Sequence, residues 1–467
     1  MAKTNTIRLA SLTFVFCHLA FSTVLTSCSF QQEDYFPESA SLRITHLNEQ
    51  LQDRLVAQSD TTQQRYGWLM QYFVAGTDDY NFEGFNIFGR FYQNGMVTLA
   101  GNHRFLRNGN ANKFTVDTSV YEMLSEEGPV LSFNTWNDIL TVLEDPVSPQ
   151  YAPGSLVSDG EGMNGDHNLV LRSIDEQAIL FRGERHGAEV RFVPCNQPWE
   201  EYVEAVAKTK ADITSSVITS YYVTNSYIES NGKTVERDTM YFAGLNRGFF
   251  TYCDRVNDPL ISSTASCVFT PTGLRLGHDY ELGSNKFREF RMAADSTCLV
   301  SEDDSVKLIA CWDNYIVNAR TAVWNFDQET LSSAQNELLE QIEAEMKKYN
   351  KAYSLASVGL GRSSGGNPVK GLVFTFYTNT AKTRTNTAGL AMTMTKPSFG
   401  KMKIDTDSDD KMDNNLNAIC NKSNAEQLVR QLASSLNGNY EITPNNYFLP
   451  TGCVLQAEGS GQGYILK

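Results

Sequence analysis

The spacing of apolar residues changes several times along the chain. Residues 39–58 place Leu47, Leu51 and Leu55 four positions apart, which predicts a helix with one apolar face. From about residue 66 the pattern becomes short alternating runs of aromatic and β-branched residues. The pair Asn94-Gly95 between two such runs is a strong hairpin signal. The first part of the chain is therefore predicted to be a helix followed by antiparallel strands.

A further helix is predicted to close this first β-domain. The segment 197–213 contains Pro198, which suits a first helical turn, and its apolar residues recur on one face. A second alternating run covers residues 215–242 and turns at Asn231-Gly232. The pattern after the helix therefore predicts a second β-rich region.

The last third of the chain alternates between helical and strand patterns. Residues 327–350 carry leucines and isoleucine at helical spacing. Ser423 and Glu426 have the spacing of a capping box, which predicts the start of another helix, and Gly438 is predicted to end it. Alternating stretches such as GLVFTFYTN between these helices predict more strands.

These patterns together predict a mainly β protein, more closely a β-rich α+β fold. We expect two or three antiparallel domains, built as sheets or barrels and separated by amphipathic helices. The expected sections are a leader at 1–27, a tether and helix at 28–60, a first β-domain with its closing helix at 61–212, a second β-rich region at 213–327, and a helix with a C-terminal α+β region at 328–467.

Composition adds a constraint on partners. The 467 residues carry a net charge of -15, which disfavours nucleic acids and anionic lipid surfaces because both would be repelled. A hydrophobic content of 41% excludes a mainly disordered chain. We therefore expect a folded, acidic protein with no nucleic-acid partner.

The N-terminus has the pattern of a targeting signal. Lys3 and Arg8 precede an apolar segment from Leu9 to Leu25, as in a secretory signal, and the segment is too short for a comfortable membrane span. The sequence Leu-Thr-Ser-Cys that ends at Cys28 resembles the bacterial lipobox, so Cys28 is the predicted lipidation site. The acidic stretch 29–34 resembles the tag that directs Bacteroidetes-type lipoproteins to the outer face of the outer membrane. An ordinary leader and an incidental acidic tether are the alternatives.

The remaining cysteines leave two interpretations open. Of the nine cysteines, one lies in the leader and Cys28 is the lipidation site, so seven remain, and an odd number leaves at least one unpaired. Cys253 with Cys267, or Cys298 with Cys311, have a hairpin-like separation that a disulfide could bridge in an oxidising compartment. Buried free thiols are the alternative.

Catalytic motifs are missing or incomplete. The stretch 361–365 fits G-x-S-x-G, but no histidine follows His278, so the required order of a serine hydrolase triad is excluded. Zinc-protease spacing of histidines is absent as well. Carboxylates such as Glu126, Glu127 and Asp166 could still form a pair for hydrolysis, but their separation in space, which sets that chemistry, cannot be read from sequence.

One acidic stretch, residues 405–414, alternates oxygen-bearing side chains as a calcium loop does. The candidate calcium ligands are Asp405, Asp407, Asp409 and Asp413. A calcium loop of the EF-hand type needs glycine at its sixth position and glutamate at its twelfth, where this chain has Asp410 and Leu416. The alternatives are therefore a calcium site and a solvated acidic turn, and no other cofactor is predicted.

Several longer stretches resemble one known family. They are RYGWLMQYF, FGRFYQNGMVTL, EEGPVLSFNTWNDILTVLEDP and GMNGDHNLVLRS. With the lipobox, they resemble the Bacteroidetes lipoprotein family called domain of unknown function 4302 over about residues 28–200, and the likeness is thinner beyond. The resemblance implies an accessory lipoprotein encoded beside TonB-dependent transporters, their surface receptor lipoproteins and a zinc metallohydrolase lipoprotein. It implies no catalytic or binding residues.

We therefore expect a lipid-anchored, surface-facing protein of the outer membrane that binds or scaffolds, without catalysis, in the uptake of a glycan or peptide nutrient. The implied partners are the membrane, a TonB-dependent transporter and its surface receptor lipoprotein. A hydrolase with a carboxylate-only site and a cell-surface interaction protein unrelated to uptake are the alternatives. A groove lined by some of the five tryptophans and acidic side chains would favour binding, and two buried carboxylates with raised pKa values would favour hydrolysis.

Overall fold

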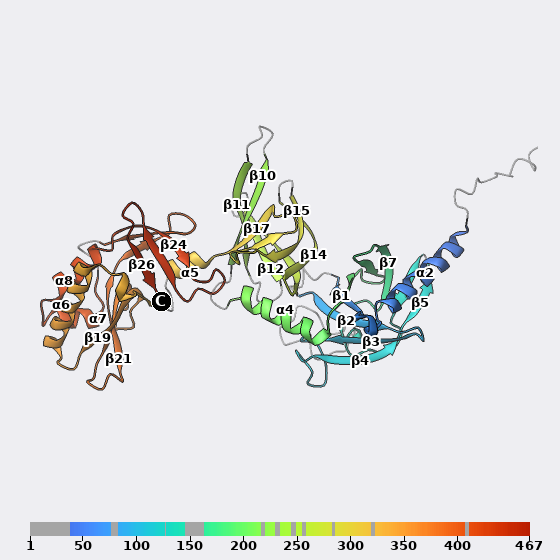
Figure 1. The fold of residues 1–467 in the computed structure, drawn as a ribbon, viewed down its shortest axis with the longest axis horizontal. Coiled ribbons are helices and arrows are strands. Elements are labelled where there is room, and N and C mark those ends of the chain that lie inside the picture. Colours follow the sequence, from blue (N-terminus) through green and yellow to red (C-terminus); the bar gives the residue numbers. More distant parts are fainter. Residues whose placement is uncertain are drawn as a thin grey trace, which may run out of the picture.

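Three β-rich units follow one another along the long axis of the molecule (Figure 1). They are a nine-stranded sheet, a closed barrel and a C-terminal unit with two smaller sheets. The computed structural model describes residues 38–75, 83–126, 128–144, 163–215, 220–228, 234–243, 249–254, 258–282, 285–318, 323–406 and 411–467. The mainly β fold class predicted from the sequence is confirmed.

The first unit is an antiparallel sheet in the order β4-β3-β2-β1-β9-β8-β7-β6-β5. Its strands are β1 (Trp68–Phe73), β2 (Phe85–Phe91), β3 (Met96–Gly101), β4 (Thr115–Val120), β5 (Glu122–Ser125), β6 (Pro129–Ser132), β7 (Asn168–Ile174), β8 (Ile179–Gly183) and β9 (Glu189–Pro194). The two edge strands, β4 and β5, are consecutive in the chain and separated only by Tyr121, so the sheet bends back toward itself. The predicted turn at Asn94-Gly95 joins β2 to β3, where Gly95 has a φ of 79° that suits glycine.

Helix α2 (Ala40–Ala57) packs against β5 and β6. Leu51 and Leu55 are fully buried, as the helical pattern predicts. Leu47, on the same face near the start of the helix, is 39% exposed, so the sheet does not cover the whole of this face. The buried leucines of this face lie in the second half of the helix.

The inner face of the first sheet holds an aromatic core. Phe181 and Phe192 lie with ring centroids 4.8 Å apart, and burial of each such side chain stabilises the fold by roughly 1.5–3 kcal/mol. His103 is buried at the edge of this core, 5.2 Å from the ring of Phe85. Its Nε2–H donates to the carbonyl oxygen of Ile139 at 2.9 Å. Burial lowers the pKa of His103 to about 4, so the ring is neutral at pH 7.

Helix α4 (Trp199–Ile213) covers the outer face of the same sheet. Trp199 stacks on Phe88 with ring centroids 5.6 Å apart. The predicted helix is confirmed, although Pro198 lies just before its first turn, as the N-cap residue. Toward its C-terminal end, α4 reaches the barrel, where Thr209 Oγ1 donates to the carbonyl oxygen of Pro271 at 2.6 Å.

The central unit is a closed barrel whose antiparallel strands pair in chain order, with the last strand returning to the first. Its strands are β10 (Ser220–Ile228), β11 (Thr234–Ala243), β12 (Phe249–Asp254), β13 (Asp258–Thr270), β14 (Gly273–Leu282), β15 (Asn285–Met292), β16 (Leu299–Ser301) and β17 (Val306–Ala310). The predicted turn at Asn231-Gly232 lies outside the described residues, between the paired strands β10 and β11.

The C-terminal unit contains the sheets β18-β19-β20-β21 and β22-β23-β24-β25-β26. Its strands are β18 (Trp324–Asn325), β19 (Ser354–Arg362), β20 (Lys370–Tyr377), β21 (Thr385–Ala391), β22 (Thr393–Thr395), β23 (Lys401–Asp405), β24 (Gly438–Pro444), β25 (Cys453–Ala457) and β26 (Gly463–Leu466). Its helices are α5 (Trp312–Asn318), α6 (Ser333–Tyr349), α7 (Asn414–Cys420) and α8 (Ala425–Ser434). Short 3-10 turns across the chain cover Thr61–Gln63, Thr141–Leu143 and Gln328–Thr330. None of the described helices has the length and apolar character needed to cross a membrane.

Both predicted C-terminal helices form, but the capping details differ. The capping box belongs to α6, where Ser332 and Gln335 bond each other's backbone N–H groups. The box predicted at Ser423 is wrong, because the Ser423 hydroxyl donates to the carbonyl oxygen of Ile419, one helix earlier. The predicted helix end at Gly438 is also wrong, since α8 ends at Ser434 and Gly438 begins β24.

Cys195, Cys298, Cys420 and Cys453 are free thiols. The predicted alternative of a Cys298–Cys311 disulfide is therefore wrong, and Cys298 is buried as a thiol. The side chain of Cys253 lies outside the described part of the chain, so its pairing with Cys267 stays a prediction.

The buried, neutral His103 predicts a specific acid sensitivity. Its pKa falls from 6.5 to about 4 on folding, so the unfolded chain binds a proton below pH 6.5 that the folded chain does not. The free energy of unfolding contains the full contribution of neutral His103 above pH 6.5, and it decreases by about 3 kcal/mol as the pH falls to 4. In His103→Gln, which stays neutral, calorimetric unfolding midpoints should fall less between pH 6.5 and 4 than in the wild type. Parallel pH profiles for the two proteins would contradict the assignment.

Candidate functional site

The sheet and the barrel touch where β1 and β2 meet β13 and β14. The backbone N–H of Gly84 donates to the carbonyl oxygen of Cys267 at 3.1 Å. Asn86 Nδ2 donates to the carbonyl oxygen of Phe269 at 2.8 Å. A Cβ at Gly84 would lie 2.7 Å from Cγ1 of Val268 on β13, so this close approach of the two units requires glycine. The contact fixes the outer face of the sheet beside two barrel strands.

Beside this contact lies a cavity of about 200 Å³, which we call the arginine cleft. Its walls come from the outer face of β1, β7, β8 and β9 and from β14 and β15 of the barrel. The lining residues are Gln71, Phe73, Arg172, Leu180, Phe181, Arg182, Glu189, Val190, Arg191, Arg275 and Arg288. Five of these are arginines, and Glu189 is the one acidic residue among them.

Strand alternation and a bulge aim the arginines outward. Successive side chains of a strand point to opposite faces, so Phe181 and Phe192 enter the inner core while Arg182 and Arg191 face out. The pairing of β7 with β8 shifts register at Arg172, which a β-bulge redirects. In the sequence, these residues can be recognised only as arginines at alternate positions of apolar strands. That pattern does not indicate that a barrel faces the strands.

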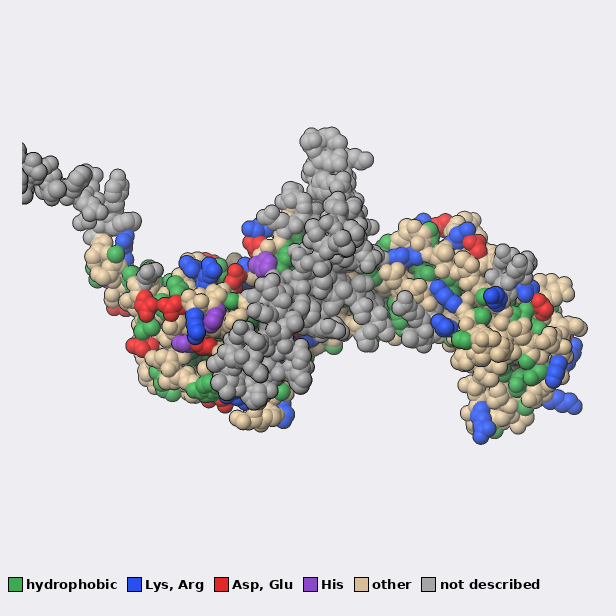
Figure 2. Space-filling view, turned by 180° about the vertical axis from the view of Figure 1, so that it is seen from behind, with side chains coloured by type: hydrophobic (Ala, Val, Ile, Leu, Met, Phe, Trp, Pro, Cys, Tyr) green, Lys and Arg blue, Asp and Glu red, His purple; other side chains and the backbone are tan. Residues whose placement is uncertain are grey.

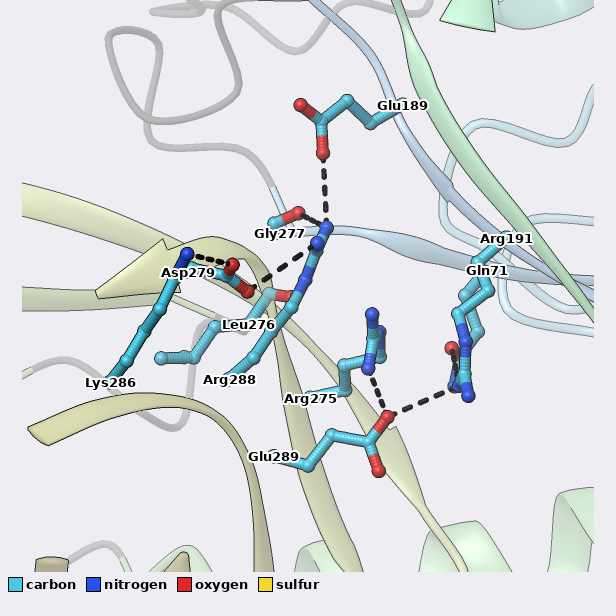
Figure 3. A network of polar contacts seen from close by, with 10 residues as sticks. All are labelled: Gln71, Glu189, Arg191, Arg275, Leu276, Gly277, Asp279, Lys286, Arg288 and Glu289. Atoms are coloured by element: carbon cyan, nitrogen blue, oxygen red, sulfur yellow. Dashed lines mark hydrogen bonds and ion pairs between the residues drawn. The ribbon is translucent and has the colours of Figure 1, made fainter. Parts of the chain in front are cut away.

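Glu289 on β15 joins the two sides of the cleft. Its Oε1 accepts a hydrogen bond from Arg191 Nη1 of the sheet at 3.1 Å and another from Arg275 Nη1 of the barrel (Figure 3). Arg191 Nη1 also donates to Oε1 of Gln71 at 3.2 Å. A single carboxylate oxygen therefore holds guanidinium groups from both units.

Arg288 makes a second ionic contact across the junction. Its Nη2 lies 3.0 Å from Oε2 of Glu189 on the sheet and also donates to the carbonyl oxygen of Gly277 (Figure 3). Asp279 Oδ1 lies 3.7 Å from Arg288 Nη1, and Lys286 Nζ pairs with Asp279 Oδ2 at 2.9 Å. These contacts fix Arg288 at the barrel side of the cleft.

Positive charge in the cleft exceeds what its carboxylates neutralise. The side chain of Arg275 is 9% exposed, and burial together with Arg191 and Arg288 lowers its pKa to about 10. The side chains of Arg172 and Arg182 are exposed and make no hydrogen bond or ion pair with any residue that the structure describes. On the face in Figure 2, acidic and basic side chains are interspersed over the first unit. The cleft is therefore a local concentration of guanidinium groups in an acidic chain.

Asp166, a carboxylate singled out from the sequence, has a structural position. It is buried, and its Oδ1 accepts the backbone N–H groups of Arg185 and His186, each at 2.9 Å. Its Oδ2 accepts the N–H of Ala188 at 3.0 Å. Asp166 therefore fixes the turn between β8 and β9.

Of the other two carboxylates named from the sequence, the structure describes Glu126. Glu126 is exposed after β5, and Glu127 lies outside the described residues. Ser363 of the G-x-S-x-G stretch is buried, and its Oγ accepts the backbone N–H of Val369 at 3.1 Å. That serine stabilises the connection between β19 and β20.

Two predicted calcium ligands are described, and they lie on different elements. Asp405 ends β23, half-exposed, and its carboxylate pairs with Lys403 at 2.8 Å. Asp413 is fully buried and caps α7 by accepting the N–H of Leu416 at 2.8 Å. Asp407 and Asp409 lie outside the described residues. Among the residues described, no three His, Cys, Asp or Glu side chains gather as a metal site, and the calcium site stays a prediction.

The tryptophans mostly fill cores. Buried tryptophans are Trp68, Trp199, Trp312 and Trp324. Trp136 is 48% exposed, with the guanidinium of Arg107 4.8 Å from its ring centroid. The described residues therefore form no groove lined by tryptophans and acidic groups, and the concave site beside the junction is lined by arginine instead.

A second cavity, of about 210 Å³, lies on the α4 side of the junction. Burial raises the pKa of Glu83, which lines it, although Lys210 and Arg104 oppose the rise. Arg104 Nε lies 3.6 Å from Glu83 Oε1. Carboxylate-only glycoside hydrolysis needs two carboxyl groups, and Glu83 is the one carboxylate among the described residues that line this cavity.

Comparison with known proteins shows that the residues of the cleft lie within the part of the chain that matches one family. A family model described as Domain of unknown function (DUF4302) matches residues 32–294. The match extends past residue 200, where the sequence resemblance thinned, and includes the sheet and the barrel as far as β15. Every residue that lines the arginine cleft lies within it. A search of the curated proteins found no match.

The shared carboxylate predicts a junction that is sensitive to Glu289. Glu289→Gln should destabilise the sheet and barrel by about 1–3 kcal/mol, because the buried Arg275 loses its ionic partner. Asp304→Asn, which breaks the exposed pair with Arg291, is the matched control and should change stability by less than about 1 kcal/mol. Differential scanning calorimetry of both variants checks this. Equal midpoints for the two variants would show that Glu289 does not hold the junction.

Proposed function

The chain belongs to the family Domain of unknown function (DUF4302), and we propose that this protein captures an anionic ligand, without converting it, as a lipid-anchored component of a nutrient-uptake system at the outer membrane. The observation that carries the proposal is the guanidinium surplus in the arginine cleft. Arg172 and Arg182 there have no partner among the described residues, and Arg275 is buried in its positive form.

The chemistry of the cleft suits oxyanions. A guanidinium group offers paired N–H donors that match carboxylate, sulfate or phosphate oxygens, and such charged hydrogen bonds are stronger than neutral ones. An added anion would also relieve the repulsion among Arg275, Arg191 and Arg288 that, with burial, lowers the pKa of Arg275. Concave sites between domains are common ligand sites. An anionic group therefore fits the cleft better than a neutral or cationic one.

The same groups are poorly suited to acid–base catalysis. Glu189 and Glu289 are engaged in ion pairs with arginines, and a guanidinium group does not give up its proton in proteins. A general acid needs a pKa near the working pH. These features favour capture over turnover in this cleft. The hydrolase alternative rests on Glu83 and its raised pKa in the second cavity.

The lipid anchor and the uptake context rest on sequence. The lipobox resemblance at Cys28 supports the anchor, and the acidic residues after it support export to the outer face. With Cys28 lipidated, ten residues of tether, 29–38, would separate the anchor from the N-cap of α2 at Ser39. The partners proposed from the family resemblance are a TonB-dependent transporter and its surface receptor lipoprotein.

The anchor is tested by exchanging its cysteine. In the native host, Cys28→Ser should remain an unprocessed precursor or leave the membrane fraction, because both lipid attachment and the apolar anchor are lost. Cys17→Ser, which changes a cysteine within the leader, is the matched control and should fractionate as the wild type does. Membrane fractionation with intact-mass measurement provides the readout. Unchanged mass and location for Cys28→Ser would reject the lipoprotein proposal.

Capture is tested with sulfate as the probe on purified residues 29–467. Sodium sulfate should raise the unfolding midpoint above that in sodium chloride of equal ionic strength, because binding to the folded state stabilises it, by about 2.7 kcal/mol at a hundredfold excess over Kd. The double variant Arg172→Ala with Arg182→Ala should lose most of the shift, which separates site binding from the general effect of sulfate. Arg291→Ala, an exposed arginine outside the cleft, should retain it.

Turnover is tested in the same preparation. Incubation with sulfated and uronate-containing polysaccharides should release no new reducing ends. Product that disappears in Glu83→Gln would overturn capture without conversion and promote the hydrolase. A sulfate shift of equal size in the wild type and the double variant would remove the cleft as the binding site.

A further inference from the structure

A second hollow adjoins the arginine cleft. This hollow has a volume of about 630 Å³ and lies against the turn between β8 and β9, so we call it the turn hollow. Arg172 and Arg182 line both spaces. Arg185 and His186 line the far end of the turn hollow. We call the two adjoining spaces together the groove; Arg172 and Arg182 are the residues that line both of them.

We propose that this groove binds a linear anionic polysaccharide, whose successive acidic groups contact arginines from Arg275 and Arg288 at the barrel end to Arg185 at the turn. The inference rests on the proposed function, because it specifies the ligand class of the same site. It also assigns a binding role to Arg185, which lies outside the arginine cleft.

The charge distribution favours a chain over a single anion. Six arginines and three glutamates line the two spaces together. Of the glutamates, Glu189 is paired with Arg288, and Glu184 accepts a hydrogen bond from Asn168 Nδ2 at 2.8 Å. The side chains of Arg172, Arg182 and Arg185 make no hydrogen bond or ion pair within the described part of the chain. One sulfate contacts only part of this row, whereas a polyanion contacts all of it.

The groove is held in place before any ligand arrives. The buried carboxylate of Asp166 accepts three backbone N–H groups of the β8–β9 turn, including that of Arg185. Gly183 allows this packing, because a Cβ there would lie 1.9 Å from Oδ2 of Asp166. Ordering the turn in the free protein reduces the entropy that binding would otherwise lose.

The walls favour a polysaccharide over a nucleic acid. Single-stranded nucleic acids gain much of their affinity from bases stacked on exposed aromatic rings. The phenylalanines that line the groove, Phe73 and Phe181, are buried.

The backbone disfavours an acidic peptide. Extended peptides commonly add as a strand to an open sheet edge. Strands β7 and β8 each pair with neighbours on both sides, so the groove floor offers no free edge. A sulfated or uronate polysaccharide needs only the guanidinium groups that project from this floor.

The test measures length dependence by titration calorimetry on residues 29–467, with heparin-derived disaccharide, tetrasaccharide and octasaccharide. Affinity should rise at least about tenfold from disaccharide to octasaccharide, and rising salt should weaken the octasaccharide most, because it displaces more counterions. Arg185→Ala should lower octasaccharide affinity by at least about fivefold while the sulfate-induced shift in unfolding midpoint stays unchanged. Arg291→Ala should alter neither measurement.

The outcomes distinguish the two proposals. Equal affinity for disaccharide and octasaccharide, with the sulfate shift intact, would overturn the continuous groove and leave anion capture standing. Absence of any sulfate or oligosaccharide binding would overturn both. The polysaccharide assignment would be overturned if oligodeoxythymidylate or polyglutamate of similar charge bound as tightly as the octasaccharide. An unchanged octasaccharide affinity in Arg185→Ala would remove the turn hollow from the site.

Discussion

One oxygen of Glu289 accepts hydrogen bonds from Arg191 of the sheet and Arg275 of the barrel, and the candidate site depends on this shared contact. Docking brings these guanidinium groups together at the junction, where Arg275 is buried and its pKa is lowered. A buried charge that loses its partner is strongly destabilising, so the carboxylate is needed for the units to meet with these faces opposed. Its single negative charge is shared by two arginines, so the pair keeps a net positive charge that can attract an anion.

Much of the fold was predictable because its signals are local. The alternation around Asn94-Gly95 and the helical spacing that predicts α6 each depend on neighbours within a few residues, and both predictions are confirmed. Predictions failed where tertiary contacts decide the outcome. Ser423 donates to the preceding helix and forms no capping box at the start of α8. The spacing of Leu47 likewise gives no sign that the sheet covers only part of α2 and leaves this residue exposed. Periodicity indicates which element forms, and it does not indicate what packs against it.

The candidate site could not be predicted from the sequence for the same reason. The arginines of the cleft are spread from residue 172 to residue 288, and no short motif unites them. They meet because the sheet and the barrel dock where Gly84 approaches Cys267 and Val268 of β13. The family match ends shortly after β15, so it contains the sheet and the barrel strands that build the cleft and leaves out β16, β17 and the C-terminal unit. The residues needed for this site therefore all belong to the family domain.

A ligand in this position would couple to the docking of the two units. An anion that contacts Arg182 of the sheet and Arg275 of the barrel binds only while they are docked, so by linkage it stabilises that arrangement. Glu289 would compete with the ligand for Arg275, but Arg172 and Arg182 have no competing partner among the described residues. The middle of the groove is thus the region where an incoming acidic group gains most. Contacts toward the barrel would then depend on how far Glu289 releases the arginines that it already holds.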